Sequence, residues 1–397
     1  MTVLQGDVRA SAEPGPVFTA WDRLLGVRDR LLASPRFRAW AAATPFTRPL
    51  ARQRTRALFD LCAGFVYSQV LYACVDLRLF DVLAEGPQAL PALAARLDLP
   101  LPGAERLLRA AASLKLVSRR RGGRFGLGPL GAAMVGNAGI AAMVRHHRML
   151  YADLADPVAL LRGQGQDTAL SAYWSYARNP GAAGLGGEVN AYTALMAASQ
   201  PLVAGEILAA YPVRRHRLLM DVGGGDGSFL LAAAAQAPAL RLRLFDLPPV
   251  AARAAERFAA ASMGHRAEAA GGSFLHDPLP PGADLVSLVR VVHDHDDDAA
   301  LRLLRAVHAA LPPGGTLLLA EPMSDTPGAE PVGDAYFGFY LMAMGQGRTR
   351  TRAELTELLH AAGFASVRRH RTHTPLLVGV LSATRDTPLS LKSVNES

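Results

Sequence analysis

Two residues capable of acid–base chemistry follow short apolar segments of this 397-residue chain. His293 lies in VVHDHDDD, directly after the apolar run DLVSLVR, and Glu321 ends the next apolar run, TLLLAE. A neutral imidazole has a proton affinity tuned near neutral pH, which suits a general base. A carboxylate near its other ring nitrogen would hold the tautomer and orientation of the ring. We therefore predict that His293 removes a proton and that Glu321 orients it.

The acidic cluster around His293 admits other interpretations. His293, Asp294, His295 and Asp296 are all metal-ligand types, but carboxylates are also favoured at a helix start by its unpaired N–H groups. We expect no metal site here. A helix-terminal or solvated role for His293 without chemistry stays open.

A glycine-rich loop, DVGGGDGSF, follows an earlier apolar run and opens a helical pattern. Gly223, Gly225 and Gly227 permit a tight turn and let a ligand approach the backbone. A dinucleotide loop would need a glycine at the position of Ser228. The mismatch disfavours a nicotinamide cofactor and favours S-adenosylmethionine, which has no pyrophosphate to seat on the helix.

Other predicted cofactor contacts lie at the ends of neighbouring strand patterns. Asp246 ends RLRLFD, where its carboxylate can accept hydrogen bonds from two ribose hydroxyls, although it also suits the cap of the next helix. Ser273 and Phe274 follow the third expected strand, near the adenine, and Phe274 is equally suited to the core. The remaining predicted contacts are Asp221, Leu247 and Arg290.

The elements that must position these residues alternate between strand and helix from about residue 218 onward. Such alternation predicts an α/β fold with a parallel sheet and helices on both faces. The segments FASVRRHRT and TPLLVGVLSAT are joined by a short turn and must therefore pair antiparallel. Residues 76–135 show a helix–helix–helix–hairpin pattern with Gly122 and Gly123 at the turn, which is typical of a winged helix.

The pattern divides the chain into five segments. The expected segments are a tail (1–17), a helical and winged-helix domain (18–140), a helical connector (141–215), a cofactor-binding domain (216–383) and a second tail (384–397).

The composition narrows the cellular setting. Cys62 and Cys74 offer neither a disulfide framework nor metal-binding spacing, which fits a reducing cytoplasm. The N-terminus is polar and lacks the apolar core of a secretory signal, and no transmembrane helix is expected. The net charge of +8 would suit an anionic partner, but the arginines are scattered and fit solvated helix faces.

Taken together, DVGGGDGSF, FDLPPV, GGSFLHDPLP, VVHDHDDD and LLLAEPM resemble the plant-caffeate and bacterial-polyketide type of O-methyltransferase from about residue 60 to 382. The resemblance implies a winged-helix dimerisation domain, a Rossmann-like class I methyltransferase domain and S-adenosylmethionine as the methyl donor. It also implies that Gly223 and Asp246 bind the cofactor, that His293 is the base and that Glu321 orients it. Within the family, the long N-terminal extension is most like the carotenoid 1-hydroxy O-methyltransferases of purple phototrophic bacteria, which act on hydroxyneurosporene and demethylspheroidene.

Three positions depart from the family pattern. Ser273 stands where an acidic residue usually meets the adenine, and His295 stands where an aromatic residue commonly follows the base. Thr349, in GQGRTRTR, occupies the place of a second acidic residue beside the base. The base is therefore expected to be less constrained, or the substrate hydroxyl to be held differently.

Two helical stripes are candidates for an apolar substrate pocket, although such stripes also suit the core. The first contains Tyr192, Met196 and Ser199, and the second contains Tyr336, Phe339, Tyr340 and Met344. They would suit a polyene or a polycyclic aromatic, so a phenolic natural product is the alternative substrate.

The expected partners are a hydrophobic small molecule and a second copy of the chain. The arginines near 52–56 and 143–149 could touch an anionic membrane, although solvated faces fit them better, so the expected location is cytoplasmic with peripheral membrane contact left open. Nucleic acid is not expected, since the third winged-helix segment is rich in Ala and Leu. A DNA-binding regulator that senses S-adenosylmethionine is the alternative of another class.

Overall fold

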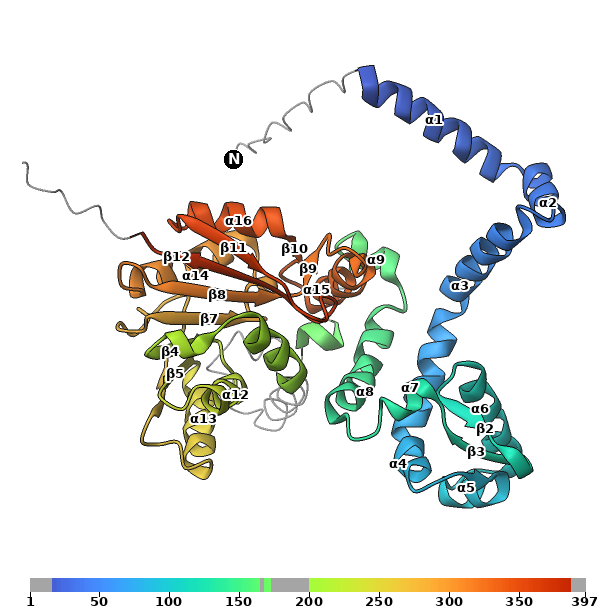
Figure 1. The fold of residues 1–397 in the computed structure, drawn as a ribbon, viewed down its shortest axis with the longest axis horizontal. Coiled ribbons are helices and arrows are strands. Elements are labelled where there is room, and N and C mark those ends of the chain that lie inside the picture. Colours follow the sequence, from blue (N-terminus) through green and yellow to red (C-terminus); the bar gives the residue numbers. More distant parts are fainter. Residues whose placement is uncertain (1–15, 165–167, 173–199, 387–397) are drawn as a thin grey trace, which may run out of the picture. The chain divides into compact units, whose positions relative to one another are not determined.

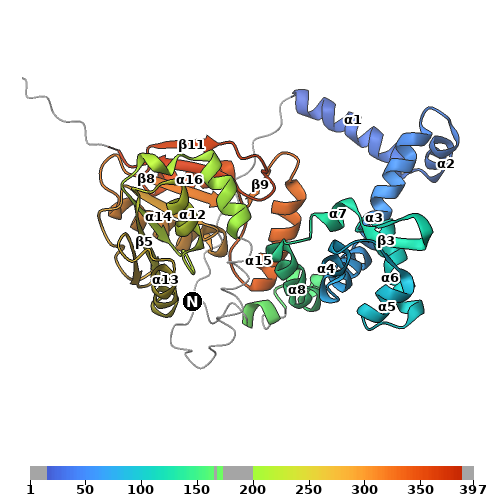
Figure 2. The same cartoon turned by 60° about the horizontal axis from the view of Figure 1, so that its bottom comes forward.

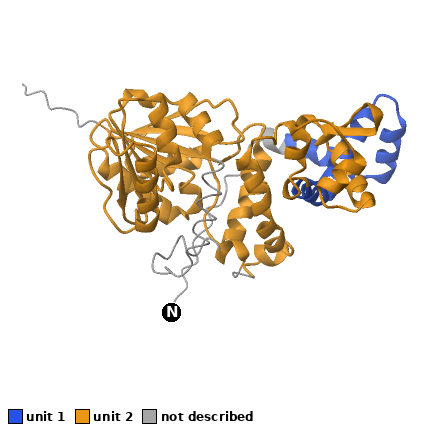
Figure 3. Cartoon of the chain, turned by 90° about the horizontal axis from the view of Figure 1, so that it is seen from below, with its two compact units in different colours: residues 1–73 blue, residues 74–397 orange. Residues whose placement is uncertain are grey.

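The computed structural model describes residues 16–164, 168–172 and 200–386. The chain divides into two compact units, residues 1–73 and 74–397 (Figure 3). The finer boundaries expected at 140 and 215 stay predictions.

The N-terminal unit is built from helices with few buried side chains. These are α1 (Pro16–Ala33), α2 (Pro35–Ala43) and most of α3 (Arg48–Asp76), which continues into the second unit. Ser34 caps α2, because its hydroxyl accepts a hydrogen bond from the Phe37 N–H at 3.4 Å. Large apolar side chains are exposed along these helices, among them Trp21, Trp40, Leu58, Leu61 and Phe65.

Helix α3 differs from one expectation drawn from the sequence. By length and composition it is long and apolar enough to cross a membrane, although no spanning segment was expected. The same apolar surface suits contact with another protein chain.

The predicted winged helix is present. It contains α4 (Leu79–Ala84), α5 (Leu90–Arg96) and α6 (Leu101–Ser113), followed by a hairpin of β2 (Val117–Arg119) and β3 (Arg124–Leu127). A short β1 (Gln88–Ala89) completes an antiparallel sheet of order β1-β3-β2. Both Gly122 and Gly123 have positive φ in the turn, which explains why glycine occurs there. Helices α7 (Pro129–Ala132), α8 (Ala138–Asp153) and α9 (Pro157–Leu161) follow.

The second unit also contains a seven-stranded sheet of order β11-β12-β8-β7-β4-β5-β6 (Figures 1 and 2). Five strands are parallel: β4 (Leu218–Val222), β5 (Arg241–Asp246), β6 (Ala267–Gly271), β7 (Leu285–Val289) and β8 (Thr316–Glu321). As predicted, β11 (Ser366–His370) and β12 (Gly379–Thr384) close the sheet as an antiparallel hairpin.

Helices cover both faces of this sheet. Helices α12 (Ser228–Gln236) and α13 (Pro248–Ala260) contribute to one buried core, and α14 (Asp297–Ala310) and α16 (Arg352–Ala361) contribute to the other. The strands read as continuous apolar runs because both faces are covered. The carboxyl ends of the parallel strands meet at one edge of the sheet, where Glu321, Asp246 and the glycine loop lie.

Replacing Gly227 with alanine is expected to lower the free energy of unfolding by about 2–4 kcal/mol. Gly227 has φ of 79°, and an added Cβ would lie 2.5 Å from the ring of Phe258. Urea denaturation would measure the loss. Gly264→Ala is the matched control, since nothing lies within 4 Å of its added Cβ, and an equal loss in both variants would contradict the argument.

Candidate functional site

The sheet places His293 against Glu321 at the carboxyl ends of two adjacent strands. Val289 of β7 is in register with Ala320 of β8, so the turn after β7 lies beside the end of β8. His293 Nδ1 is hydrogen-bonded to Glu321 Oε2, and Glu321 Oε1 accepts the Val291 and Val292 N–H groups at 3.0 and 2.7 Å. Both side chains are buried. The carboxylate therefore fixes both the backbone that carries His293 and the orientation of its ring.

A second carboxylate lies at the other nitrogen of the ring. Asp294 Oδ1 is 3.0 Å from His293 Nε2, and it comes from the same short turn, Val292–Asp294. Burial alone would lower the pKa of His293, but the charges of Asp294 and Glu321 outweigh it and raise the pKa to about 10. The two carboxylates therefore favour the protonated form of the ring in the free protein.

Thr349, the residue at the place of the family's second acidic group, is half-buried. Within the described part of the chain, its side chain makes no hydrogen bond to His293. Asp294 supplies a second carboxylate instead, which the sequence analysis considered only as part of a possible metal site.

An aromatic ring that the sequence analysis did not select also contacts the base. Phe337 meets His293 edge-on, with ring centroids 5.8 Å apart. Residues Pro331–Phe337 form a π-helix that leads into α15 (Gly338–Met344), so the regular α-helical spacing assumed for the Tyr336 and Phe339 stripe does not apply at its start. The wider turn explains why helical periodicity did not single out Phe337.

Arg350 is the second residue that sequence reasoning missed. Its side chain is buried, with only 2% of the residue exposed. The guanidinium donates hydrogen bonds to the Val292 carbonyl at 2.9 Å and to the His295 carbonyl at 2.7 Å. Its Nε also donates to Asp297 at 2.8 Å. Arg350 thus holds the backbone on both sides of His293. One feature of the sequence could have pointed to Arg350. It directly follows Thr349, the residue that stands at the position of the family's second acidic residue beside the base.

Arg350→Met should lower kcat by about 10- to 100-fold while leaving cofactor affinity nearly unchanged, because the base loses its backbone support. The two freed carbonyls should also lower the free energy of unfolding by about 2–4 kcal/mol. Steady-state kinetics, cofactor titration and urea denaturation would measure these effects. Arg352→Met removes an exposed arginine nearby as the control, and equal kinetics in the two variants would contradict a role for Arg350.

The glycine loop joins β4 to α12 with three positive φ angles, 69° at Gly223, 61° at Gly225 and 79° at Gly227. A Cβ at Gly223 would lie 2.9 Å from Val291, so the loop packs against the turn that carries the base. Nothing lies within 4 Å of a Cβ built at Gly225. The loop backbone is therefore covered by Val291 at Gly223, whereas a ligand could approach it at Gly225.

Two carboxylates flank this loop. Asp246 accepts the Gly225 N–H at 2.8 Å and the Leu247 N–H at 2.7 Å, and burial raises its pKa to about 6 against the opposing effect of these bonds. Asp221 is fully buried; Ser287 Oγ donates to it at 2.6 Å, and burial raises its pKa to about 7. Among the described residues, Asp221 Oδ2 has no hydrogen-bond partner. These groups are suited to bind a ligand that carries hydroxyl and ammonium donors.

The other predicted cofactor contacts lie around the same edge. The Ser273 N–H donates to Asp277 at 2.7 Å, and Phe274 meets His295 edge-on at 5.4 Å. Phe274 also lies within 3.8 Å of a Cβ built at Gly223, which places its ring near the glycine loop. Arg290 directly follows β7 and has φ of 56°, a conformation that bulky residues rarely adopt. Its guanidinium donates to Gln200 at 3.1 Å.

The predicted pocket residues are only partly described. Tyr192, Met196 and Ser199 lie outside the described residues. Tyr340 is buried, and its hydroxyl lies 2.7 Å from His146 Nε2; Met344 is fully buried in a cluster with Leu150. Tyr336 pairs in the same way with His147 at 2.7 Å, so both histidines of the 143–149 segment are engaged by tyrosines. Pocket lining by Tyr340 and Met344 stays a prediction.

Two family models match the chain. An O-methyltransferase domain matches residues 151–365, and an O-methyltransferase dimerisation domain matches residues 59–137. The second match supports a homodimer.

Curated relatives match over most of their length. A demethylspheroidene O-methyltransferase of Cereibacter sphaeroides is 46% identical over 364 residues, which cover 91% of this chain and 94% of the relative. The Rhodobacter capsulatus protein of the same name is 43% identical, with coverage of 90% and 88%. A 3-hydroxy-5-methyl-1-naphthoate 3-O-methyltransferase of Streptomyces sahachiroi is 32% identical, with coverage of 83% and 94%.

Solved structures show the same fold. Human N-acetylserotonin methyltransferase in complex with S-adenosylmethionine has a TM-score of 0.71 at 26% identity, covering 84% of this chain and 98% of that one. The methyltransferase CalO1 of calicheamicin biosynthesis has a TM-score of 0.72 at 25% identity, with coverage of 84% and 98%.

Proposed function

This chain belongs to the O-methyltransferase family with an N-terminal dimerisation domain, and from that premise we propose that it methylates the 1-hydroxyl group of an acyclic carotenoid. The methyl donor is S-adenosylmethionine, and the proposed acceptors are demethylspheroidene and hydroxyneurosporene. The observation that carries the substrate assignment is 46% identity over 94% of a relative with that activity in its name. The buried His293–Glu321 pair supports the proposed chemistry, since a protein that only senses the cofactor needs no base.

The residues of the glycine loop fit this cofactor. Asp221 Oδ2 is a buried carboxylate oxygen without a partner among the described residues, as expected where a bound ammonium group completes the site. Asp246 is held by two backbone N–H groups, and its remaining lone pairs suit ribose hydroxyls. We assign Gly223, Gly225 and Leu247 to the same site. Ser273, Phe274 and Arg290 complete its proposed lining.

When bound, S-adenosylmethionine supplies an activated methyl group on a sulfonium. The chain must then align the acceptor hydroxyl and take its proton at His293 Nε2. Glu321 keeps the other ring nitrogen protonated and stabilises the imidazolium that forms. Asp294 lies at Nε2 in the free protein and must yield that position to the hydroxyl. An alkyl alcohol is a weaker acid than a phenol, whose pKa is roughly 10, so proton removal should accompany methyl transfer.

Methyl transfer from isotope-labelled S-adenosylmethionine tests this proposal. Label should appear in demethylspheroidene or hydroxyneurosporene presented in detergent. Methylation of a panel of phenols should be at least about tenfold slower, a difference of about 1.4 kcal/mol in activation free energy. Label found only in phenols would keep the enzyme class and refute the carotenoid assignment. No label in any acceptor, with cofactor binding intact, would refute both acceptors.

A further inference from the structure

The second half of the winged-helix region, from α6 onward, is strongly basic. Residues 101–137 contain seven arginine and lysine side chains and one acidic side chain, a balance of +6 out of +8 for the whole protein. We call these the basic wing: Arg106, Arg109, Lys115, Arg119, Arg120, Arg121 and Arg124. All seven are exposed. The one acidic residue, Glu105, is 3.4 Å from Arg109.

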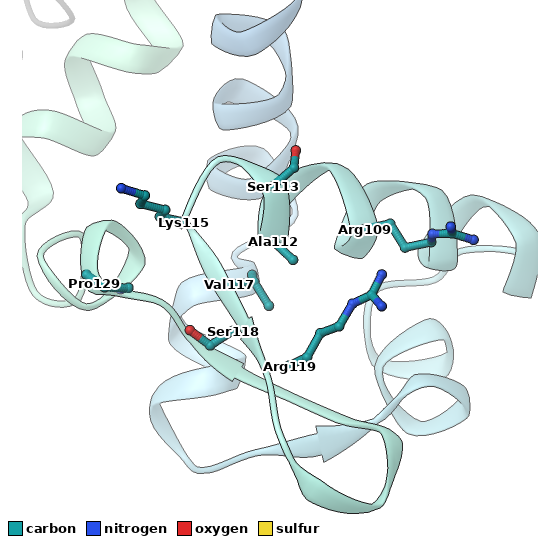
Figure 4. Close-up of a pocket in the computed structure, with 8 residues that line it drawn as sticks. All are labelled: Arg109, Ala112, Ser113, Lys115, Val117, Ser118, Arg119 and Pro129. Carbon is teal, nitrogen blue, oxygen red and sulfur yellow. The ribbon is translucent and has the colours of Figure 1, made fainter. Parts of the chain in front are cut away.

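Part of the basic wing surrounds a hollow of about 420 Å³ lined by α6, β2 and Pro129. Figure 4 shows Arg119 reaching toward α6, which carries Arg109, with Lys115 on the other side of β2. In the described part of the chain, neither Lys115 nor Arg119 forms an ion pair. An anion held in the hollow would be attracted by the cations that line it. Ser113 and Ser118 also line the hollow and add hydroxyl donors.

We propose that the basic wing binds the phosphate headgroups of an anionic membrane. The same region exposes apolar side chains: Leu130 follows Pro129 and is 55% exposed, and Leu101 at the start of α6 is 49% exposed. Cations combined with exposed apolar groups are typical of surfaces that bind the membrane interface. The choice of a membrane rests on the proposed carotenoid substrate, which dissolves in lipid.

Two other occupants fit the basic wing less well. The dimerisation-domain match also spans the exposed apolar side chains at the end of α3, so a second copy of this chain can pair there without the basic wing. Duplex DNA is read by the N-terminal residues of a recognition helix, and α6 begins with Leu101, Pro102 and Gly103.

Flotation with vesicles tests the proposal. The full-length protein should bind vesicles containing phosphatidylglycerol but not pure phosphatidylcholine, and binding should weaken with salt. The variant R109Q/K115Q/R119Q should bind about 100-fold more weakly. The control R52Q/R54Q/R56Q removes the same charge from exposed positions of α3 and should bind like the native protein.

Three outcomes would overturn the proposal. The first is that the native protein does not bind anionic vesicles. The second is that both triple variants lose vesicle binding equally. The third is that the native protein binds duplex DNA at physiological salt but does not bind vesicles. The vesicles contain neither carotenoid nor cofactor, so the result does not depend on turnover. Methylation of carotenoid in detergent should be unchanged in R109Q/K115Q/R119Q, which separates failure of this proposal from failure of the proposed function.

Discussion

Replacing His293 with glutamine is expected to lower kcat by about 100- to 10,000-fold, the usual contribution of a general base. Glutamine has an amide of similar size but cannot accept the hydroxyl proton. The residues proposed to bind the cofactor, among them Asp221 and Asp246, are not changed, so the Kd for S-adenosylmethionine should stay within about twofold. Single-turnover methyl transfer and calorimetric titration of the cofactor would measure the two quantities.

A matched histidine makes this test specific. His265→Gln changes an exposed histidine in the turn before β6 and should leave kcat unchanged. Full activity in His293→Gln would refute the assignment of the base. A loss of cofactor affinity equal to the loss of kcat would mean that His293 supports the binding site and does not take the proton.

The pairing of His293 with Glu321 was predictable because it depends on regular elements. Strand and helix patterns alternate, so β7 and β8 were expected to be parallel, and ligands bind at the carboxyl ends of such strands. Residues 28 positions apart in the chain were thereby placed at one edge. The glycine loop and Asp246 were found for the same reason, since the loop follows β4 and Asp246 ends β5.

The residues that sequence reasoning missed lie where the backbone departs from a regular period. Phe337 ends a π-helix, so α-helical spacing assigns it to the wrong face. Arg350 contacts carbonyl groups in a turn more than fifty residues away, and a buried arginine is unusual enough that its type predicts exposure. Asp294 is next to His293 in the chain, and the short 3-10 helix Val292–Asp294 brings its carboxylate to Nε2 of the imidazole.

These missed groups change how the base is understood. The sequence suggested a histidine with a missing acidic partner at Thr349, and hence a less constrained ring. In the structure the ring lies between Glu321 and Asp294, and Arg350 holds the backbone around it. The imidazole of His293 is therefore held firmly, and its protonated form is favoured before the substrate binds. To act as a base, the ring must first lose this proton.

This dependence fixes the sign of two pH effects. Because turnover needs neutral His293, kcat/KM should rise as pH increases from 6 toward the raised pKa of about 10. The contribution of His293 to stability has the opposite slope. Its folded pKa lies above the ordinary value of 6.5, so that contribution is full below pH 6.5 and is lost as pH rises through about 10.

Glu321→Gln should have an effect as large as the loss of the base, lowering kcat by about 100- to 10,000-fold. The glutamine carbonyl can still accept the Val291 and Val292 N–H groups, so the turn should stay folded. Its amide N–H, however, donates a hydrogen bond to His293 Nδ1. A neutral ring must then carry its proton on Nε2, where it cannot accept one from the substrate. The variant therefore loses activity through the tautomer and not through the fold.

The pH profile distinguishes this explanation from simple damage. Removing the charge of Glu321 lowers the pKa of His293, so the residual kcat/KM should reach its plateau at a lower pH than in the native protein. Nitrogen NMR of the imidazole would report the tautomer directly. Glu357→Gln removes an equal charge from an exposed position of α16 and should change neither profile. An unshifted profile in Glu321→Gln would contradict the proposed link between this carboxylate and the proton on His293.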